Sequence, residues 1–343
     1  MLAQANPSID LTKLALEVTL TEGANISPDP ARVMDYSHPQ KFTVTSEDGN
    51  WHKEYSVIID TFDLPFQYDF EHYELNETGK YQVFFEETQG TALFKQYIWA
   101  SGNSGFALTG VGRNPQEYPT VSIENGIDGS RAIKLETKST GQFGETVKMP
   151  IAAGNLFLGS FDVNNAVQKP LKATRFGLPF GKKPLQLKGY YKYTPGTQPF
   201  KAKDKNGNTV TIPGQEDEGD IYAVLYEAAE LDGKALDGNN VLTSENIVAL
   251  ARVEVEKKDE FTAFHVDFHY GSRIPIDWPK FIQDQRDPSD DGTAPYLSFS
   301  EEKMKNYEYN LAVVFTSSKY GAYFAGSVGS TLCIDKVEIV CEK

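Results

Sequence analysis

Apolar and polar residues alternate along many short segments of the chain, and Gly, Asn, Asp and Pro separate these segments. A period of two places successive side chains on opposite faces of a strand, so each segment predicts a β-strand. No strand–helix–strand alternation and no long helical pattern is present, which favours an all-β fold with a large jelly-roll sandwich. The clearest candidate strands span residues 118–123, 131–137, 156–161, 185–194, 220–227, 247–255, 261–270, 296–300, 309–317 and 331–340.

The beginning of the chain has its own pattern and predicts a separate small domain. Residues 41–59 predict a hairpin around an Asp-Gly pair, because glycine adopts the positive φ that a tight turn requires. The segment 14–20 alternates strictly and predicts a further strand. Thr61-Phe-Asp-Leu-Pro-Phe66 predicts a short stiff linker. We therefore divide the chain into a small domain at 1–62 and a larger one at 66–343.

The last segment carries the most information about fold class. A Gly/Ser turn at 326–330 leads into a β-branched strand that carries one acidic residue, Asp335, among apolar neighbours. Many extracellular β-sandwich modules that hold sugars close in this way, with the final strand beside the first. We therefore expect the last strand to lie next to the first strand of the larger domain.

Charge and hydropathy disfavour several classes of partner. The chain has 33 Lys and Arg residues against 48 Asp and Glu residues, so its formal net charge is −15. Nucleic acid and anionic lipid surfaces would be repelled and are poor candidates as partners. No apolar run of about 18 residues is present, so the sequence predicts no transmembrane segment.

A series of motifs runs in order through the larger domain, and together they carry a family resemblance. The motifs are Asp69-Phe-Glu-His-Tyr73, Trp99-Ala-Ser-Gly-Asn103, Asn155-Leu-Phe-Leu-Gly-Ser-Phe161, Phe176-Gly-Leu-Pro-Phe180, Leu187-Lys-Gly-Tyr-Tyr-Lys-Tyr193, Asp220-Ile-Tyr-Ala-Val-Leu-Tyr226 and Gly329-Ser-Thr-Leu-Cys-Ile-Asp335. With these motifs, residues 66–343 resemble the putative carbohydrate metabolism domain family of gut-dwelling Gram-negative bacteria. The resemblance implies a galactose-binding-like jelly roll that follows an immunoglobulin-like β-sandwich, and residues 8–60 fit that preceding domain.

The resemblance also implies a location outside the cytoplasm. Members of the family are typically exported, often as lipoproteins, so we expect an extracellular or periplasmic protein with a lipid anchor in its full-length precursor. The opening residues, Met1-Leu-Ala-Gln-Ala-Asn-Pro7, lack the basic and apolar regions of a signal peptide, and we interpret the signal as removed. The family has no established catalytic residues, so none is transferred to this chain.

Tyr190-Tyr-Lys-Tyr193 is a candidate sugar-contacting segment because it places aromatic rings on both faces of one strand. One face must belong to the core, and Tyr190 or Lys192 on the other face could meet a ligand. Sugar rings pack their apolar faces on exposed aromatic rings, while their hydroxyls need polar partners. Complete packing of these rings is the competing interpretation.

A second candidate lies in the segment 261–270, which alternates cleanly. Its phenylalanines face one way, so His265, Asp267 and His269 face the other. Such side chains can bind sugar hydroxyls, and adjacent pairs can share a metal ion. A solvated sheet face is the alternative.

Two tryptophans complete the candidate ligand site. Trp99 precedes a Ser/Gly/Asn segment and is expected near a loop, and Trp278 lies in a proline-flanked loop. Binding aromatics often sit on loops, although either ring could instead anchor its loop to the core.

The family resemblance implies one candidate cofactor, a structural calcium ion. Carbohydrate-binding jelly rolls often hold calcium between their first and last strands, where Glu71 and Asp335 could serve as ligands. Alternatively, Asp335 caps a turn through backbone N–H groups. The acidic segment 284–292 has the composition of a calcium loop without its spacing, so we interpret it as a solvated charge run.

Three functions follow from these observations. The preferred one is an exported protein that binds an oligo- or polysaccharide through its jelly roll. A glycoside hydrolase or lyase is the second, although no catalytic motif is present; Asp267 with Asp277 or Glu227 is a conceivable carboxylate pair. The third is a structural or adhesive surface component.

Overall fold

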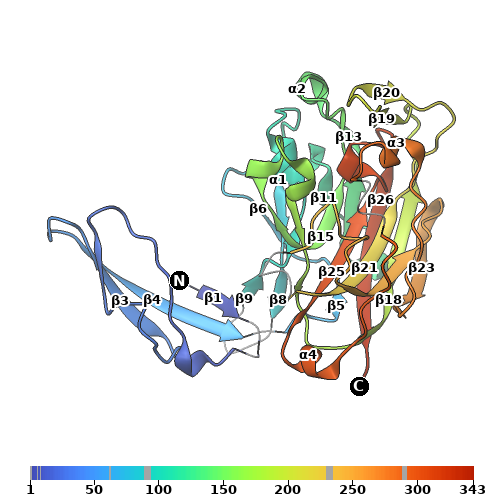
Figure 1. Ribbon diagram of the computed structural model, residues 1–343. Coiled ribbons are helices and arrows are strands. Elements are labelled where there is room, and N and C mark those ends of the chain that lie inside the picture. The colour runs from blue at the N-terminus through green and yellow to red at the C-terminus, as the bar shows by residue number, and fades with distance from the viewer. Residues whose placement is uncertain are drawn as a thin grey trace. The chain divides into compact units, whose positions relative to one another are not determined.

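The computed structural model describes residues 2–5, 7, 9–61, 63–88, 94–228, 235–287 and 292–343. The chain forms two compact units, each built mainly from strands (Figure 1). The small unit comprises Met1–Leu64 with Lys305–Tyr307, and the large unit comprises Pro65–Met304 with Glu308–Lys343. Among the helices of the described residues, none is long and apolar enough to cross a membrane.

The described part of the small unit is organised around a four-stranded sheet in the order β1-β4-β3-β2. Its strands are β1 (Leu2–Ala5), β2 (Asn25–Ser27), β3 (Gln40–Thr45) and β4 (His52–Thr61). The predicted hairpin is confirmed, because β3 and β4 pair antiparallel with Phe42 opposite Tyr55. Phe42 packs with the buried residues Tyr36, Val57 and Ile59 to form the core of this unit.

The segment 14–20 is not a strand, and that prediction is wrong. Leu14 N–H donates to the carbonyl of Met34 at 3.1 Å, and Leu16 N–H donates to the carbonyl of Pro30 at 2.8 Å. Proline has no N–H to return, so a continuous ladder cannot form between the two segments. The alternation nevertheless identified side chains that pack on the core, since Leu14 and Leu16 both do so.

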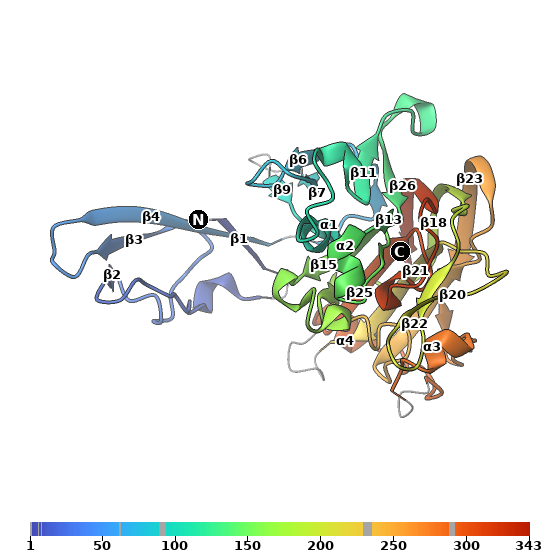
Figure 2. The same cartoon turned by 90° about the horizontal axis from the view of Figure 1, so that it is seen from above.

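The large unit is a sandwich of two sheets, seen as neighbouring layers in Figure 2. The eight-stranded sheet has the order β10-β15-β25-β21-β22-β24, with β16 paired to β15 and β17 paired to β25. The six-stranded sheet has the order β11-β12-β26-β18-β23, with β5 paired to β26. The strands of the first sheet are β10 (Trp99–Ala100), β15 (Asn155–Phe161), β16 (Thr174–Phe176), β17 (Leu178–Pro179), β21 (Asp220–Glu227), β22 (Ile247–Val253), β24 (His269–Tyr270) and β25 (Tyr309–Thr316). Those of the second are β5 (Gln67–Tyr68), β11 (Thr120–Ile123), β12 (Ala132–Glu136), β18 (Pro184–Thr194), β23 (Lys258–Asp267) and β26 (Thr331–Cys341).

The remaining elements of the large unit are short. Two-stranded pairs are formed by β6 (Tyr73–Leu75) with β7 (Gln82–Phe84), β8 (Glu86–Thr88) with β9 (Phe94–Gln96), β13 (Lys138–Ser139) with β14 (Ile151–Ala152), and β19 (Lys201–Lys203) with β20 (Thr209–Thr211). The α-helices are α1 (Asn103–Ala107), α2 (Gly141–Thr146), α3 (Lys280–Gln283) and α4 (Glu301–Lys305). Single 3-10 turns are Leu11–Lys13 in the small unit and Pro115–Glu117, Ile127–Gly129, Val163–Asn165, Pro170–Lys172 and Gly321–Tyr323 in the large one.

The all-β class and the layered sandwich predicted from the alternation are confirmed. The last strand, β26, pairs with β5, the first strand of the large unit, and Val337 lies opposite Tyr68. One predicted strand is wrong, because residues 296–300 belong to no strand. Tyr296 is instead 6% exposed and packs in an apolar cluster. Burial on that cluster explains the apolar content of the segment without strand pairing.

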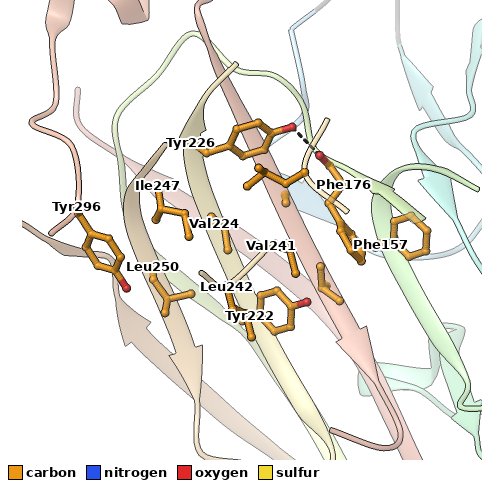
Figure 3. Packing of buried hydrophobic residues seen from close by; sticks show 13 residues of the cluster. Phe157, Phe176, Tyr222, Val224, Tyr226, Val241, Leu242, Ile247, Leu250 and Tyr296 are labelled. Atoms are coloured by element: carbon orange, nitrogen blue, oxygen red, sulfur yellow. Dashed lines mark hydrogen bonds between the residues drawn. The ribbon is translucent and has the colours of Figure 1, made fainter. Parts of the chain in front are cut away.

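The central strand of the eight-stranded sheet, β21, is buried on both faces. Every residue of β21 is buried, so Tyr222, Val224 and Tyr226 are covered although they face away from their neighbours Ile221 and Ala223. Figure 3 shows this second face, where the Tyr226 hydroxyl donates to the carbonyl of Phe176 at 2.6 Å. Residues of the connecting segments also pack on this face, namely Leu236, Val241, Leu242 and Tyr296.

Candidate functional site

A cavity of about 190 Å³, here called the first cavity, lies on the covered face of the eight-stranded sheet. Phe157, Tyr222 and Val314 contribute from β15, β21 and β25, and Trp278 and Tyr323 contribute from connecting segments. The cavity therefore combines a floor of sheet residues with aromatic side chains at its walls. Concave, mainly apolar surfaces with a few polar groups are typical of small-molecule sites.

An ion pair supplies polar groups to the first cavity. Arg252 on β22 donates from Nε to Asp220 Oδ1 at 2.9 Å and from Nη2 to Oδ2 at 2.6 Å. Both side chains are largely buried, and this two-point geometry holds both in place. Burial lowers the pKa of Arg252, but the charge and hydrogen bonds of Asp220 outweigh burial and raise it above its ordinary value. Arg252 therefore stays charged beside the cavity.

Trp278 and Arg286 form the second polar feature of the first cavity. The Arg286 guanidinium carbon lies 4.3 Å from the centroid of the Trp278 ring, which is cation–π geometry. Arg286 Nη1 also donates to the Tyr323 hydroxyl at 2.9 Å. Trp278 was predicted from its loop position, and the structure places it in a partly buried loop beside this cavity. Arg286 was missed, because no spacing in the sequence connects it with Trp278.

The second cavity has a volume of about 490 Å³, and some of its lining residues come from β5, β8 and β26. It is richer in carboxyl groups than the first cavity: Asp69, Glu86, Glu87 and Glu338 contribute one each, and Tyr190 contributes an aromatic ring. No lining residue is shared between the two cavities. The large unit therefore holds two separate concave sites.

Glu86 is the most perturbed carboxyl group of the second cavity. It is 8% exposed, and its Oε1 accepts a hydrogen bond from the Trp99 indole Nε1–H at 2.8 Å. Burial raises the pKa of Glu86 to about 7, the Trp99 hydrogen bond opposes that rise, and the charge of Asp69 adds to it. Sequence reasoning missed Glu86, since adjacent glutamates on a short strand carry no distinctive signal.

Trp99 anchors its segment to the core, which was the alternative interpretation of its position beside a loop. It is on β10 and is only 4% exposed, with its ring 5.0 Å from that of Tyr68 and 5.4 Å from that of Phe70. The apolar ring is buried in the core and its single polar atom is satisfied by Glu86. Trp99 thus positions Glu86 from inside the sandwich.

Tyr190 and Lys192 lie on the outer face of β18, as the alternation indicated. Tyr191 and Tyr193 are 4% and 2% exposed and belong to the core, whereas Tyr190 and Lys192 are half-buried. Tyr190 lines the second cavity. Lys192 does not line either cavity, and its Nζ lies 5.3 Å from the centroid of the Phe261 ring.

His265, Asp267 and His269 are exposed but do not form one row. His265 and Asp267 belong to β23 in the six-stranded sheet, whereas His269 belongs to β24 in the eight-stranded sheet. Asp267 accepts a hydrogen bond from Gln186 Nε2 at 2.6 Å, and His269 Nε2 lies 3.1 Å from the Ser272 hydroxyl. The chain changes sheets between Asp267 and His269, which separates the three side chains. Within the described residues, no group of three His, Cys, Asp or Glu side chains is arranged to hold a metal ion.

Asp335 and Glu71 have the contacts of turn-capping residues rather than calcium ligands. Asp335 Oδ2 accepts hydrogen bonds from Ile127 N–H at 2.6 Å and the Ser130 hydroxyl at 2.9 Å. Glu71 Oε1 accepts from Arg131 N–H at 2.9 Å, at the end of the same turn. Calcium needs six to eight oxygen ligands, whereas these carboxylate oxygens face hydrogen-bond donors. The residues present therefore do not fit a calcium site at this position.

The acidic segment 284–292 lies only partly within the described residues, because residues 288–291 are outside them. Within the described part, Asp284 follows the last residue of α3 and forms an ion pair with Lys280, the first residue of that helix. Such an i,i+4 ion pair accounts for this carboxylate without a metal ion.

The comparisons with known proteins place this geometry in a family. The model described as "Putative carbohydrate metabolism domain" matches residues 69–340, and the model described as "SGBP, N-terminal" matches residues 3–59. No curated protein matches the chain.

Two solved structures are similar over most of the chain. One, described as a putative glycoside hydrolase from Bacteroides thetaiotaomicron VPI-5482, is 41% identical with a TM-score of 0.74, and the match covers 99% of this chain and 89% of that one. The other, described as a putative glycoside hydrolase from Bacteroides vulgatus ATCC 8482, is 34% identical with a TM-score of 0.64, and the match covers 82% of this chain and 99% of that one. The resemblance inferred from the motifs is thereby confirmed, and the chain belongs to the putative carbohydrate metabolism domain family.

Proposed function

We propose that the protein is an exported surface component that binds oligo- or polysaccharide in the first cavity and takes part in polysaccharide utilisation. The observation that carries this proposal is Trp278 at the cavity wall, held against Arg286, close to the buried Asp220–Arg252 pair. An aromatic ring supports the apolar face of a sugar, and charged groups exchange hydrogen bonds with its hydroxyls. Membership of a carbohydrate-related family supports the ligand class.

Binding fits the first cavity better than hydrolysis does. Glycoside hydrolysis uses two carboxyl groups on either side of the scissile bond. Among the described residues that line the first cavity, Asp220 is the only Asp or Glu, and its two oxygens are engaged by Arg252. The volume of about 190 Å³ also lies below the roughly 300–1,000 Å³ of pockets that enclose larger ligands, so we expect a short saccharide unit to enter.

Calorimetric titration with size fractions of a mixed plant and host oligosaccharide pool tests this proposal. Replacing a central aromatic contact commonly costs about 1.4–3 kcal/mol, so Trp278→Ala should bind roughly 10–100-fold more weakly than the unmodified protein. Trp51→Ala is the matched control, because Trp51 is 51% exposed and belongs to the small unit. Equal affinity of the Trp278→Ala variant and the unmodified protein would contradict the assignment.

Export to the cell surface, with a lipid anchor on the full-length precursor, is part of the same proposal. The match of residues 3–59 to the SGBP N-terminal model supports it. Protease added to intact cells that express the full-length precursor should remove the protein, and labelled palmitate should be incorporated into it. If the protein is fully protected in intact cells but is digested in permeabilised cells, a surface location is contradicted.

A further inference from the structure

The second cavity has the groups of a hydrolytic site. Its volume of about 490 Å³ falls in the range of ligand pockets, and it lies apart from the first cavity. We propose that this cavity hydrolyses a glycosidic bond, with Glu86 as the proton donor and Asp69 as the carboxylate that activates water. No residue that lines it also lines the first cavity, so the two sites can be tested separately.

Glu86 meets the requirements of a general acid. It lines the cavity, is 8% exposed, and is oriented by the hydrogen bond from the Trp99 indole at 2.8 Å. Trp99 is itself fixed by its packing against Tyr68 and Phe70. Burial is the main reason that the pKa of Glu86 rises to about 7. A carboxyl group with such a pKa holds its proton in a large share of molecules near neutral pH and can deliver it to a leaving oxygen.

Asp69 is the candidate partner for Glu86, because both residues line the cavity and the charge of Asp69 contributes to the raised pKa of Glu86. It is also exposed to solvent. Glu87 is less suited, because His72 Nε2 lies 3.8 Å from Glu87 Oε2 and pairs with it when protonated. One buried acid and one solvated carboxylate in a single cavity is the arrangement that glycoside hydrolysis uses. The other titratable groups that line the cavity are Tyr68, Tyr190, Lys336 and Glu338.

Tyr190 provides a separate reason to expect a saccharide here. It lines the cavity and adds a half-buried aromatic ring on which the apolar face of a sugar can pack. Tyr68 also lines the cavity, but its hydroxyl oxygen is fully enclosed and is not offered to a ligand.

The reaction that follows from these roles consumes one water molecule for each bond cleaved. Glu86 transfers its proton to the glycosidic oxygen as the bond from that oxygen to the anomeric carbon breaks, and the bonding electrons stay on the oxygen. A water oxygen forms the new bond to the anomeric carbon while Asp69 accepts a proton from it. Asp69 then releases this proton to solvent and Glu86 takes one up, which restores both groups.

A reducing-end assay on plant and host polysaccharides tests the proposal. General acid–base groups contribute roughly 10²–10⁴-fold, so Glu86→Gln and Asp69→Asn should each lower the rate of cleavage at least about 100-fold. Glu260→Gln, an exposed glutamate on β23 outside both cavities, should cleave at the rate of the unmodified protein. The rate should also fall as the pH rises above about 7, where Glu86 loses its proton.

The results that would overturn the proposal are separable from those on glycan binding. Release of no reducing ends by the unmodified protein from any polysaccharide between pH 5 and 8 would remove the activity. Cleavage by Glu86→Gln at the unmodified rate would remove the assigned acid. Asp69 is exposed, so Asp69→Asn should fold normally. This variant therefore keeps the proposal testable if Glu86→Gln fails to fold. The affinity of Trp278→Ala for oligosaccharides reports only on the first cavity.

Discussion

Each cavity of the large unit contains a buried carboxyl group, but the two groups have different hydrogen-bond partners. In the first cavity, Asp220 is 3% exposed and faces the Arg252 guanidinium, which binds both of its oxygens. In the second, Glu86 is 8% exposed and accepts a hydrogen bond from the uncharged indole of Trp99. A full positive charge compensates the loss of water around a carboxylate, and an indole N–H does so only in part. Burial therefore leaves an ion pair in one cavity and a proton-holding acid in the other.

This difference separates the roles of the two sites. A carboxylate locked to arginine can orient hydroxyl groups but is a poor proton donor. A buried carboxyl with a pKa of about 7 can give up a proton near neutral pH. The same unit thus has a cavity with a fixed ion pair on the eight-stranded sheet and a buried acid, Glu86, on β8 of the separate β8–β9 pair.

Breaking the ion pair of the first cavity should have the largest effect on stability. Arg252→Met leaves Asp220 buried without its partner, which typically costs about 3–5 kcal/mol of unfolding free energy. Urea unfolding monitored by tryptophan fluorescence measures this loss. Arg252→Met combined with Asp220→Asn removes both charges and should recover much of the stability. A single variant as stable as the unmodified protein would show that the pair is not desolvated.

Replacing the Glu86 carboxyl of the second cavity by a neutral amide should raise the free energy of unfolding, whereas breaking the ion pair lowers it. The pKa of Glu86 is raised from 4.5 to about 7 in the folded protein. Below pH 4.5 both states hold the proton; between 4.5 and 7 the unfolded chain releases it first, so stability falls as pH rises through this window. Glu86→Gln stays neutral and its carbonyl oxygen can still accept the Trp99 N–H, so it should be more stable above pH 7 by on the order of 3 kcal/mol.

The control for this prediction is the pH dependence itself. At pH 4, where Glu86 is protonated in both states, Glu86→Gln and the unmodified protein should unfold at nearly the same urea concentration. A stability difference that is equal at pH 4 and pH 8 would show that the effect does not come from the charge of Glu86.

Changing the cation on Trp278 should have a smaller effect, confined to ligand binding. Arg286→Lys keeps the positive charge but loses the planar stacking over the indole and the fixed geometry of its N–H groups. Cation–π contacts contribute about 0.5–2 kcal/mol, so oligosaccharide affinity should fall several-fold. Calorimetric titration beside Trp278→Ala checks the order: affinity should decrease from the unmodified protein to Arg286→Lys to Trp278→Ala. Arg286→Lys binding more weakly than Trp278→Ala would contradict the central role of the ring.

Replacing the exposed histidines should have the smallest effect. His265 and His269 lie on different sheets and line neither cavity. Exposed substitutions away from special contacts usually change stability by less than about 0.5 kcal/mol. His265→Ala and His269→Ala should therefore match the unmodified protein in unfolding, oligosaccharide binding and polysaccharide cleavage. A loss of binding in either variant would indicate a third site on this surface.

The sequence predicted the architecture well because alternation reports on a sheet with one solvated face. It placed Tyr191 and Phe264 inside and Tyr190 and His265 outside, in agreement with the structure. It failed where burial has another cause. Leu14 and Tyr296 are apolar because they cover a core, although neither belongs to a strand.

The candidate site was harder to predict because its members are distant in sequence. Trp278 was found from its loop, but its contact with Arg286 and its position near the Asp220–Arg252 pair depend on the folded arrangement. Glu86 was not found, since its burial and its bond to Trp99 arise from packing between segments. Local patterns record which face a side chain takes, and they do not record which distant side chain it meets.

The measurement that tests the central claim most directly is a crystal structure of the protein soaked with the mixed oligosaccharide pool. The account predicts density for a saccharide unit in the first cavity, with a sugar ring against Trp278 and polar contacts near Arg252 and Arg286. Saccharide density found only outside this cavity, for example on the outer face of β18 and β23, would contradict it.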